Sequence, residues 1–158
     1  MKTRAIALTL MVCVLALATS FAKDHPMNPQ MGTWKLNEAK SKLPAGATKN
    51  VTVIYTAVGD MTKVTTDGFT GDGKPSHTEW TGKFDGKDYP LTGDPTADTR
   101  SYVKVNQYTL TLENKKAGKV TTSAKVVVAA DGKTRILTGS GMNAAGEKVT
   151  SSQFYEKQ

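Results

Sequence analysis

The sequence is poor in the side chains from which metal sites and covalent catalytic sites are most often built. Its 158 residues include one cysteine, Cys13, and two histidines, His25 and His77. Cys13 lies in an apolar N-terminal stretch that we expect to be removed, so the mature chain would have no thiol. This excludes disulfides, thiolate metal sites and a cysteine nucleophile. With His25 in a polar leader, no histidine cluster remains, and we expect neither a metal nor a cofactor.

Residues suited to acid–base or nucleophilic catalysis are also scattered. His77 and Glu79 lie two apart on an expected strand and share a face. They could form a metal or acid–base pair, but without a further ligand we expect them to face solvent. Asp85 and Asp88 are better explained as turn residues than as a carboxylate pair for glycoside hydrolysis, and no Gly-x-Ser-x-Gly element is present. We expect no catalytic residues and no enzymatic activity.

The N-terminus has the three parts of a secretory signal peptide. Lys2 and Arg4 supply the positive charge, residues 5–18 are almost entirely apolar, and Ser20-Phe21-Ala22 places small residues around a cleavage site. The apolar stretch is shorter than the about 20 residues that a membrane-spanning helix needs. We therefore expect residues 1–22 to be a signal peptide and the protein to be periplasmic or secreted.

Cleavage there would leave 136 residues with a net charge of +5, because two of the 21 basic residues and none of the 14 acids precede the cleavage site. Such a chain fits one domain with a core of its own. The lysines are dispersed, so we expect a weak attraction to an anionic envelope surface at most. We expect no nucleic-acid partner, and a monomer.

Turn residues recur at short intervals through the rest of the chain. Gly, Asn and Asp, which tolerate the backbone of tight hairpins, punctuate segments rich in Thr and Val. Asn37 could cap a short helical segment that ends before Pro44. The expected strands are 32–36, 50–58, 61–69, 76–84, 87–91, 98–105, 108–114, 119–129, 133–139 and 148–157. This pattern predicts an all-β antiparallel up-and-down meander that closes on itself.

Two short motifs, Gly-x-Trp at residues 32–34 and Tyr-Glu-Lys at residues 155–157, stand at the two ends of this meander, and they resemble motifs of the calycin superfamily, which includes lipocalins and fatty-acid-binding proteins. Gly32-Thr33-Trp34-Lys35-Leu36 resembles the Gly-x-Trp element that starts lipocalin barrels, and Phe154-Tyr155-Glu156-Lys157 resembles the close of fatty-acid-binding proteins. The whole mature chain looks like small exported bacterial lipocalin-like proteins without a defined activity. The resemblance implies a roughly ten-stranded calycin-like barrel over residues 32–158, with a mouth that the short helical insert covers little. Residues 23–31 are polar and contain proline, and we expect them to form a flexible leader.

A ligand in such a barrel would meet the side chains on the inner face. Few large aliphatic residues are available to fill the interior, which favours a pocket for a small hydrophobic or amphipathic molecule. The expected lining residues are Tyr55, Trp80, Tyr108, Gln153 and Tyr155. Fatty-acid-binding proteins have Arg-x-Tyr in the last strand, and this chain has Gln153 and Tyr155 at the matching positions, without the charge that would offset a buried anion.

Two features leave alternatives open. Arg100 and Arg135 are the only mature arginines. We expect both at the surface, although either could turn inward to meet an anion or to cover Trp34. The function also has competing explanations: a ligand-binding barrel, an envelope structural or interaction protein without a small-molecule ligand, and, with the least support, a hydrolase or isomerase using the same pocket.

Overall fold

The computed structural model describes residues 28–142 and 148–158, which form one closed antiparallel barrel. Neighbouring strands follow one another along the chain, and β1 pairs with both β2 and β10 to close the ring. The strands are β1 Gly32–Leu36, β2 Lys49–Val58, β3 Met61–Phe69, β4 Pro75–Gly82, β5 Tyr89–Thr92, β6 Thr99–Lys104, β7 Thr109–Lys116, β8 Lys119–Val128, β9 Thr134–Met142 and β10 Lys148–Lys157. The expected ten-stranded all-β meander is confirmed.

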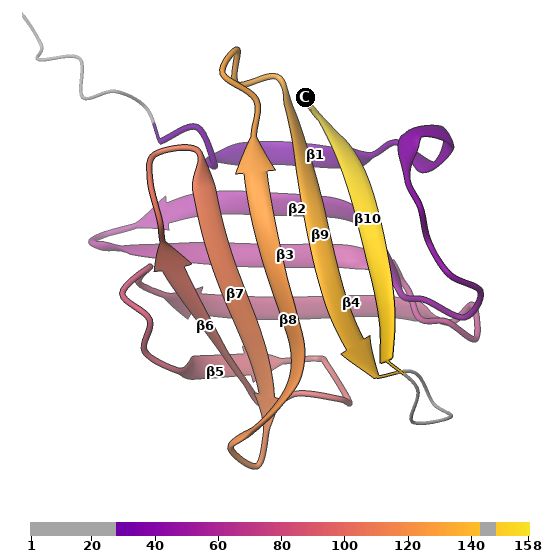
Figure 1. Cartoon of the computed structure of the whole chain (residues 1–158). Coiled ribbons are helices and arrows are strands. Elements are labelled where there is room, and N and C mark those ends of the chain that lie inside the picture. The colour runs from indigo at the N-terminus through magenta and orange to yellow at the C-terminus, as the bar shows by residue number, and fades with distance from the viewer. Residues whose placement is uncertain (1–27, 143–147) are drawn as a thin grey trace, which may run out of the picture.

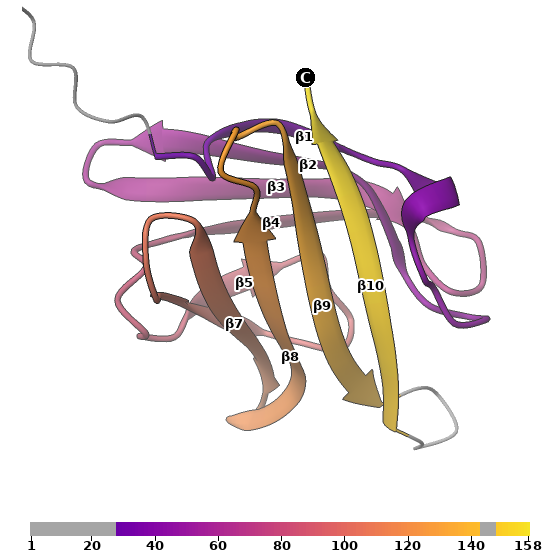
Figure 2. The ribbon, with the colours of Figure 1, turned by 45° about the horizontal axis from the view of Figure 1, so that its top comes forward.

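The strands form two layers that cross one another. In Figure 1, β1–β4 run crosswise behind β7–β10, and the turned view of Figure 2 shows the same two layers from above. The barrel therefore has two ends. One end, which we call the η1 end, holds η1 (Glu38–Lys40), the turn from β3 to β4 and the turn from β7 to β8. At the opposite end, the Trp34 end, β2 turns into β3 and β8 turns into β9.

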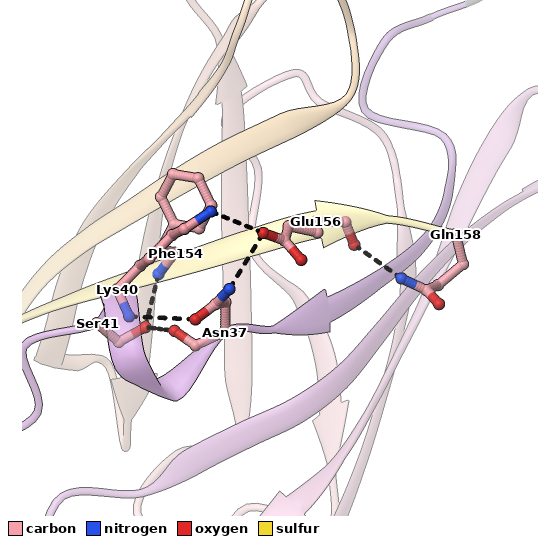
Figure 3. Close-up of polar contacts among 6 residues, drawn as sticks. All are labelled: Asn37, Lys40, Ser41, Phe154, Glu156 and Gln158. Atoms are coloured by element: carbon pink, nitrogen blue, oxygen red, sulfur yellow. Dashed lines mark hydrogen bonds and ion pairs between the residues drawn. The ribbon is translucent and has the colours of Figure 1, made fainter.

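The short helical segment is a single 3₁₀ turn that is fastened to the last strand. The Asn37 side chain accepts a hydrogen bond from the Lys40 backbone N–H and so caps the turn, as its sequence position predicts. Asn37 Nδ2 and Lys40 Nζ both donate to Glu156 on β10, and Ser41 Oγ accepts from the Phe154 backbone N–H (Figure 3). These contacts fix the connection between β1 and β2 along the outside of β10.

The chain entering β1 packs against the barrel. Asn28 to Met31, which the sequence places in the leader, form a turn. Gln30 is buried there and donates from Nε2 to the Tyr108 carbonyl, while its own carbonyl accepts from Trp34 Nε1. The signal peptide expected at residues 1–22 lies outside the described residues. No described helix is long and apolar enough to cross a membrane.

Candidate functional site

The register of the ring decides which side chains face the interior. On paired antiparallel strands, residues opposite one another point to the same face, and that face alternates along each strand. Trp34 pairs with Val53, Val64 with Trp80, and all four are buried. The same alternation places the inward positions of β6–β10 at every second residue, through Arg100, Leu112, Ala124, Leu137 and Gln153. Along the ten strands these inward positions hold no carboxylate and no imidazole.

The Trp34 end of the interior is filled around a buried arginine. The Arg135 guanidinium carbon lies 4.7 Å from the Trp34 ring centroid, 5.0 Å from that of Tyr55 and 4.8 Å from that of Tyr155. Arg135 is 1% exposed, and its Nε and Nη1 have no hydrogen-bond partner. The expectation of a surface position for Arg135 is wrong. Three aromatic faces offset part of the cost of burying its charge.

A second aromatic cluster extends this filled region across the barrel. The Tyr102 ring packs edge-on against Trp80 at 4.8 Å and against Tyr55 at 6.4 Å between centroids, and the Tyr55 and Tyr102 hydroxyl oxygens lie 3.4 Å apart. Phe84 stacks on Trp80 at 6.2 Å, and Tyr89 meets the same ring edge-on. These rings therefore close the Trp34 half of the barrel to a ligand.

The buried tyrosines stay protonated over the ordinary pH range. Burial raises the pKa of Tyr102, and the nearby Tyr55 adds to that rise, while Arg100 and Arg135 partly oppose it. Burial likewise raises the pKa of Tyr155, against the opposing effect of Arg135. The charges of both arginines thus act on the hydroxyl of Tyr102. The Tyr155 hydroxyl donates to Gln153 Oε1 over 2.7 Å.

The η1 half of the interior has a different lining. Its inward positions on β4, β8, β9 and β10 are occupied by small side chains, and several of these stay half-buried although they point into the barrel. These half-buried residues are Thr78, Thr122, Ala124, Gly141 and Ser151. We infer that solvent reaches the inner wall here, because small side chains do not fill the width of a ten-stranded ring.

Arg100 on β6 places a positive charge at an inward position in the η1 half of the barrel. Its Nε donates to Asn114 Oδ1 on β7 over 2.7 Å, and its guanidinium carbon lies 5.9 Å from the Tyr102 ring centroid. Its carbonyl accepts from Trp80 Nε1 over 2.8 Å. Arg100 is half-buried and faces inward, so the expectation of a surface position is wrong for this arginine as well. Because alternation puts Arg100 in phase with Tyr102, the sequence already held the signal for an inward position.

The structure separates the five residues that the sequence proposed as ligand contacts. Tyr55, Trp80 and Tyr155 are 3%, 1% and 0% exposed, and they belong to the packed core of the Trp34 half. Tyr108 precedes β7 and is partly buried against that core, where its carbonyl holds Gln30. Gln153 is buried and faces inward from β10. Of the five, Gln153 lies nearest along its strand to the η1 half, and the inward residues Asn114, Thr122 and Ala124 belong to that half itself.

A hollow of about 720 Å³ lies elsewhere, on the outer face of β6–β10. Most of its lining is Ser, Thr and Lys side chains at positions that alternate with the inward ones, such as Ser123, and the inward residues Leu112, Ala124 and Gly139 border it as well. Glu113 and Lys125 also line it and are exposed. We regard it as a surface depression, because most of its lining side chains lie on the outer face of the sheet. It is nevertheless a rival location for any bound molecule.

His77 and Glu79 belong to an exposed polar cluster outside the barrel. His77 Nδ1 lies 2.6 Å from Asp67 Oδ1, His77 Nε2 lies 3.6 Å from Glu79 Oε1, and Lys63 Nζ pairs with Glu79 over 2.7 Å. No group of three or more such side chains among the described residues is arranged to hold a metal ion.

The stabilising effect of the pairing between His77 and Asp67 depends on pH, and the direction of the pKa shift of His77 gives its sign. The hydrogen bond that the His77 ring donates to the Asp67 carboxylate is the main cause that raises the pKa of His77 above its ordinary value, and the charges of Asp67 and Glu79 add to it. We expect the His77 midpoint in an NMR titration to lie above that of a histidine in a denatured peptide, and Asp67→Asn to lower it. A raised pKa means that the pairing stabilises the fold below the unfolded-state pKa and is lost as the pH rises through the folded-state value. An unchanged midpoint in Asp67→Asn would contradict this assignment.

The chain has a structural likeness to a known protein but no match to a protein family. No protein-family model matches the chain, and no curated protein matches it. Among solved structures, the chain is similar to lobster apocrustacyanin A1, with 14% sequence identity and a TM-score of 0.42. The match covers 84% of this chain and 63% of that chain, so this chain spans less than two thirds of its length.

Proposed function

We propose that the protein is exported and that its barrel binds a small hydrophobic or amphipathic molecule, without converting it, in the η1 half of the interior. Export rests on the charge and hydropathy pattern of residues 1–22 alone. Binding rests on one structural observation: inward side chains at the η1 end are small and remain half-buried, whereas the Trp34 half is packed with rings. A concave, partly apolar space with a few polar groups is the usual form of a small-molecule site.

The floor and walls of the proposed site suit a molecule with one polar end. Leu137 and Ala124 supply apolar surface that packs against the core, and Thr122, Ser151 and Asn114 supply hydroxyl and amide groups. The absence of carboxylate and imidazole side chains from the inward strand positions leaves no pair for acid–base catalysis there. This is why we propose binding and not turnover.

A substitution that fills the proposed site with a larger side chain tests whether the ligand binds there. Ala124→Leu adds a bulky side chain on the inner wall, and we expect it to weaken binding of the neutral fluorescent probe N-phenyl-1-naphthylamine by about tenfold to a hundredfold, the equivalent of the about 1–3 kcal/mol that overpacking costs. Fluorescence titration measures this. Ser123→Leu is the matched control, because it adds the same bulk one residue away, on the outer face that lines the 720 Å³ hollow.

The two variants separate the interior from the outer hollow. If Ser123→Leu weakens probe binding and Ala124→Leu does not, the site is the outer hollow and the proposal is wrong. If Ala124→Leu instead lowers the free energy of unfolding by about 1–3 kcal/mol without altering probe binding, the interior is already filled at that position. A wild-type protein that binds no probe would favour the alternative of an envelope interaction protein.

A further inference from the structure

The interior of the barrel carries positive charge without a negative partner. Arg100 and Arg135, the arginines of the described chain, both face inward. The ion pairs of the described residues are formed by lysines or His77 with carboxylates outside the barrel, and neither arginine takes part in one. Charges withdrawn from water are normally paired. The interior is therefore electrostatically incomplete as it stands.

The two arginines differ in what can reach them. Arg135 is 1% exposed and enclosed by the rings of Trp34, Tyr55 and Tyr155, which leaves no access for a ligand atom. Arg100 is half-buried on the solvent-reached wall. A ligand in the η1 half would thus meet the Arg100 guanidinium, and the fixed charge of Arg135 behind the aromatic layer would add to the positive potential.

The Arg100 guanidinium is also held in place. Its Nε is engaged by Asn114 Oδ1 over 2.7 Å, Tyr102 lies below it, and its backbone is tied to Trp80 Nε1. Its two terminal nitrogens form no hydrogen bond to any residue in 28–142 or 148–158. A guanidinium fixed through Nε presents its remaining N–H groups as a fork, which matches a carboxylate or another planar oxyanion.

We propose that the ligand of this barrel is an amphipathic anion, whose acid group binds the free edge of Arg100 and whose apolar part lies over Ala124 and Leu137. This inference rests on the proposed function, since it concerns the same half of the interior. Asn114 is a positioning residue for Arg100, because its side chain fixes the guanidinium through Nε. The anion supplies the negative charge that the inward strand positions lack.

The test compares two probes that differ only in the acid group. Decanoate and decan-1-ol compete for the site against N-phenyl-1-naphthylamine, on protein obtained by expressing the full chain. We expect decanoate to displace the dye at a concentration about tenfold lower than decanol, since a hydrogen bond between charged groups is stronger than one between neutral groups. Arg100→Gln should abolish this preference, so that decanoate and decanol displace the dye at similar concentrations.

Matched variants exclude a general charge effect and a folding defect. Lys104→Gln removes a positive charge from an exposed position of the same strand and should keep the full preference for decanoate. Arg100→Lys keeps the charge but loses the fork, so it should keep only part of the preference. The preference of the wild-type protein needs no variant and so tests the inference even if Arg100→Gln does not fold.

The outcomes distinguish failure of this inference from failure of the proposed function. If the dye binds but decanoate and decanol compete equally in the wild type, the ligand is not selected as an anion, and this inference is overturned while the proposed function stands. The same holds if Arg100→Gln folds and keeps the decanoate preference. If the wild type binds neither the dye nor decanoate, both proposals fail.

Discussion

Replacing Trp34 with alanine is expected to lower the free energy of unfolding by about 3–5 kcal/mol, as measured by equilibrium denaturation in urea. Trp34 is fully buried at one end of the barrel. Its ring carries Arg135 on one side, with Lys157 Nζ 5.1 Å from the ring centroid, and its Nε1 donates to the Gln30 carbonyl over 2.9 Å. Alanine would leave a cavity and expose a buried cation to it.

Trp34→Phe serves as the control for this substitution. Phenylalanine keeps an aromatic face for Arg135 but loses the donor to Gln30, so its cost should be close to that of an unsatisfied buried polar group, about 1–3 kcal/mol. If alanine costs no more than phenylalanine, the ring is not what supports Arg135, and our description of this end of the barrel is wrong.

Gly93→Ala is expected to destabilise the barrel by about 3 kcal/mol. Gly93 has a φ of +80°, and a Cβ at this position would overlap the His77 carbonyl oxygen and lie 3.3 Å from Thr78 Cα. The left-handed backbone costs a side chain about 1–2 kcal/mol, and forcing extra bulk against packed atoms costs about 1–3 kcal/mol. The position is critical because β5 joins β4 and β6 through only short runs of paired residues.

Gly59→Ala separates the two parts of that cost. Gly59 has a φ of +59°, and an added Cβ there meets nothing within 4 Å. Only the backbone strain remains, so we expect a loss of about 1–2 kcal/mol in the same urea experiment. Equal losses at Gly59 and Gly93 would show that the close approach between the β5–β6 connection and β4 does not constrain the ring.

The barrel is well predicted by the sequence because its signals are local. Turn residues with left-handed backbone, such as Gly59, Gly118 and Gly132, fall where the spacing of Gly, Asn and Asp places them. The strands 32–36, 61–69 and 148–157 match those expected, and the others differ only near their ends. Closure of the ring also follows from pattern, since an open meander of this length would leave two long edges unpaired.

The site is less well predicted because its character depends on packing between distant strands. Aromatic residues mark the inner face, but the sequence does not show that Tyr55, Trp80 and Tyr102 touch one another and fill one half of the interior. The inward position of Arg135 conflicts with the usual preference of charge for the surface, and only its three aromatic neighbours explain it. Gln30 is buried although it lies in a segment without a periodic pattern of apolar residues, so the sequence does not indicate its burial.

We expect the η1 half of the interior to hold a ligand with its acid group at Arg100. A crystal structure of the protein soaked with 2-bromodecanoate tests this most directly, because the anomalous signal of bromine marks the atom beside the carboxylate. We predict a bromine peak inside the barrel, next to the Arg100 guanidinium. A peak confined to the outer hollow beside Ser123 and Lys125, or no peak in the interior, would contradict it.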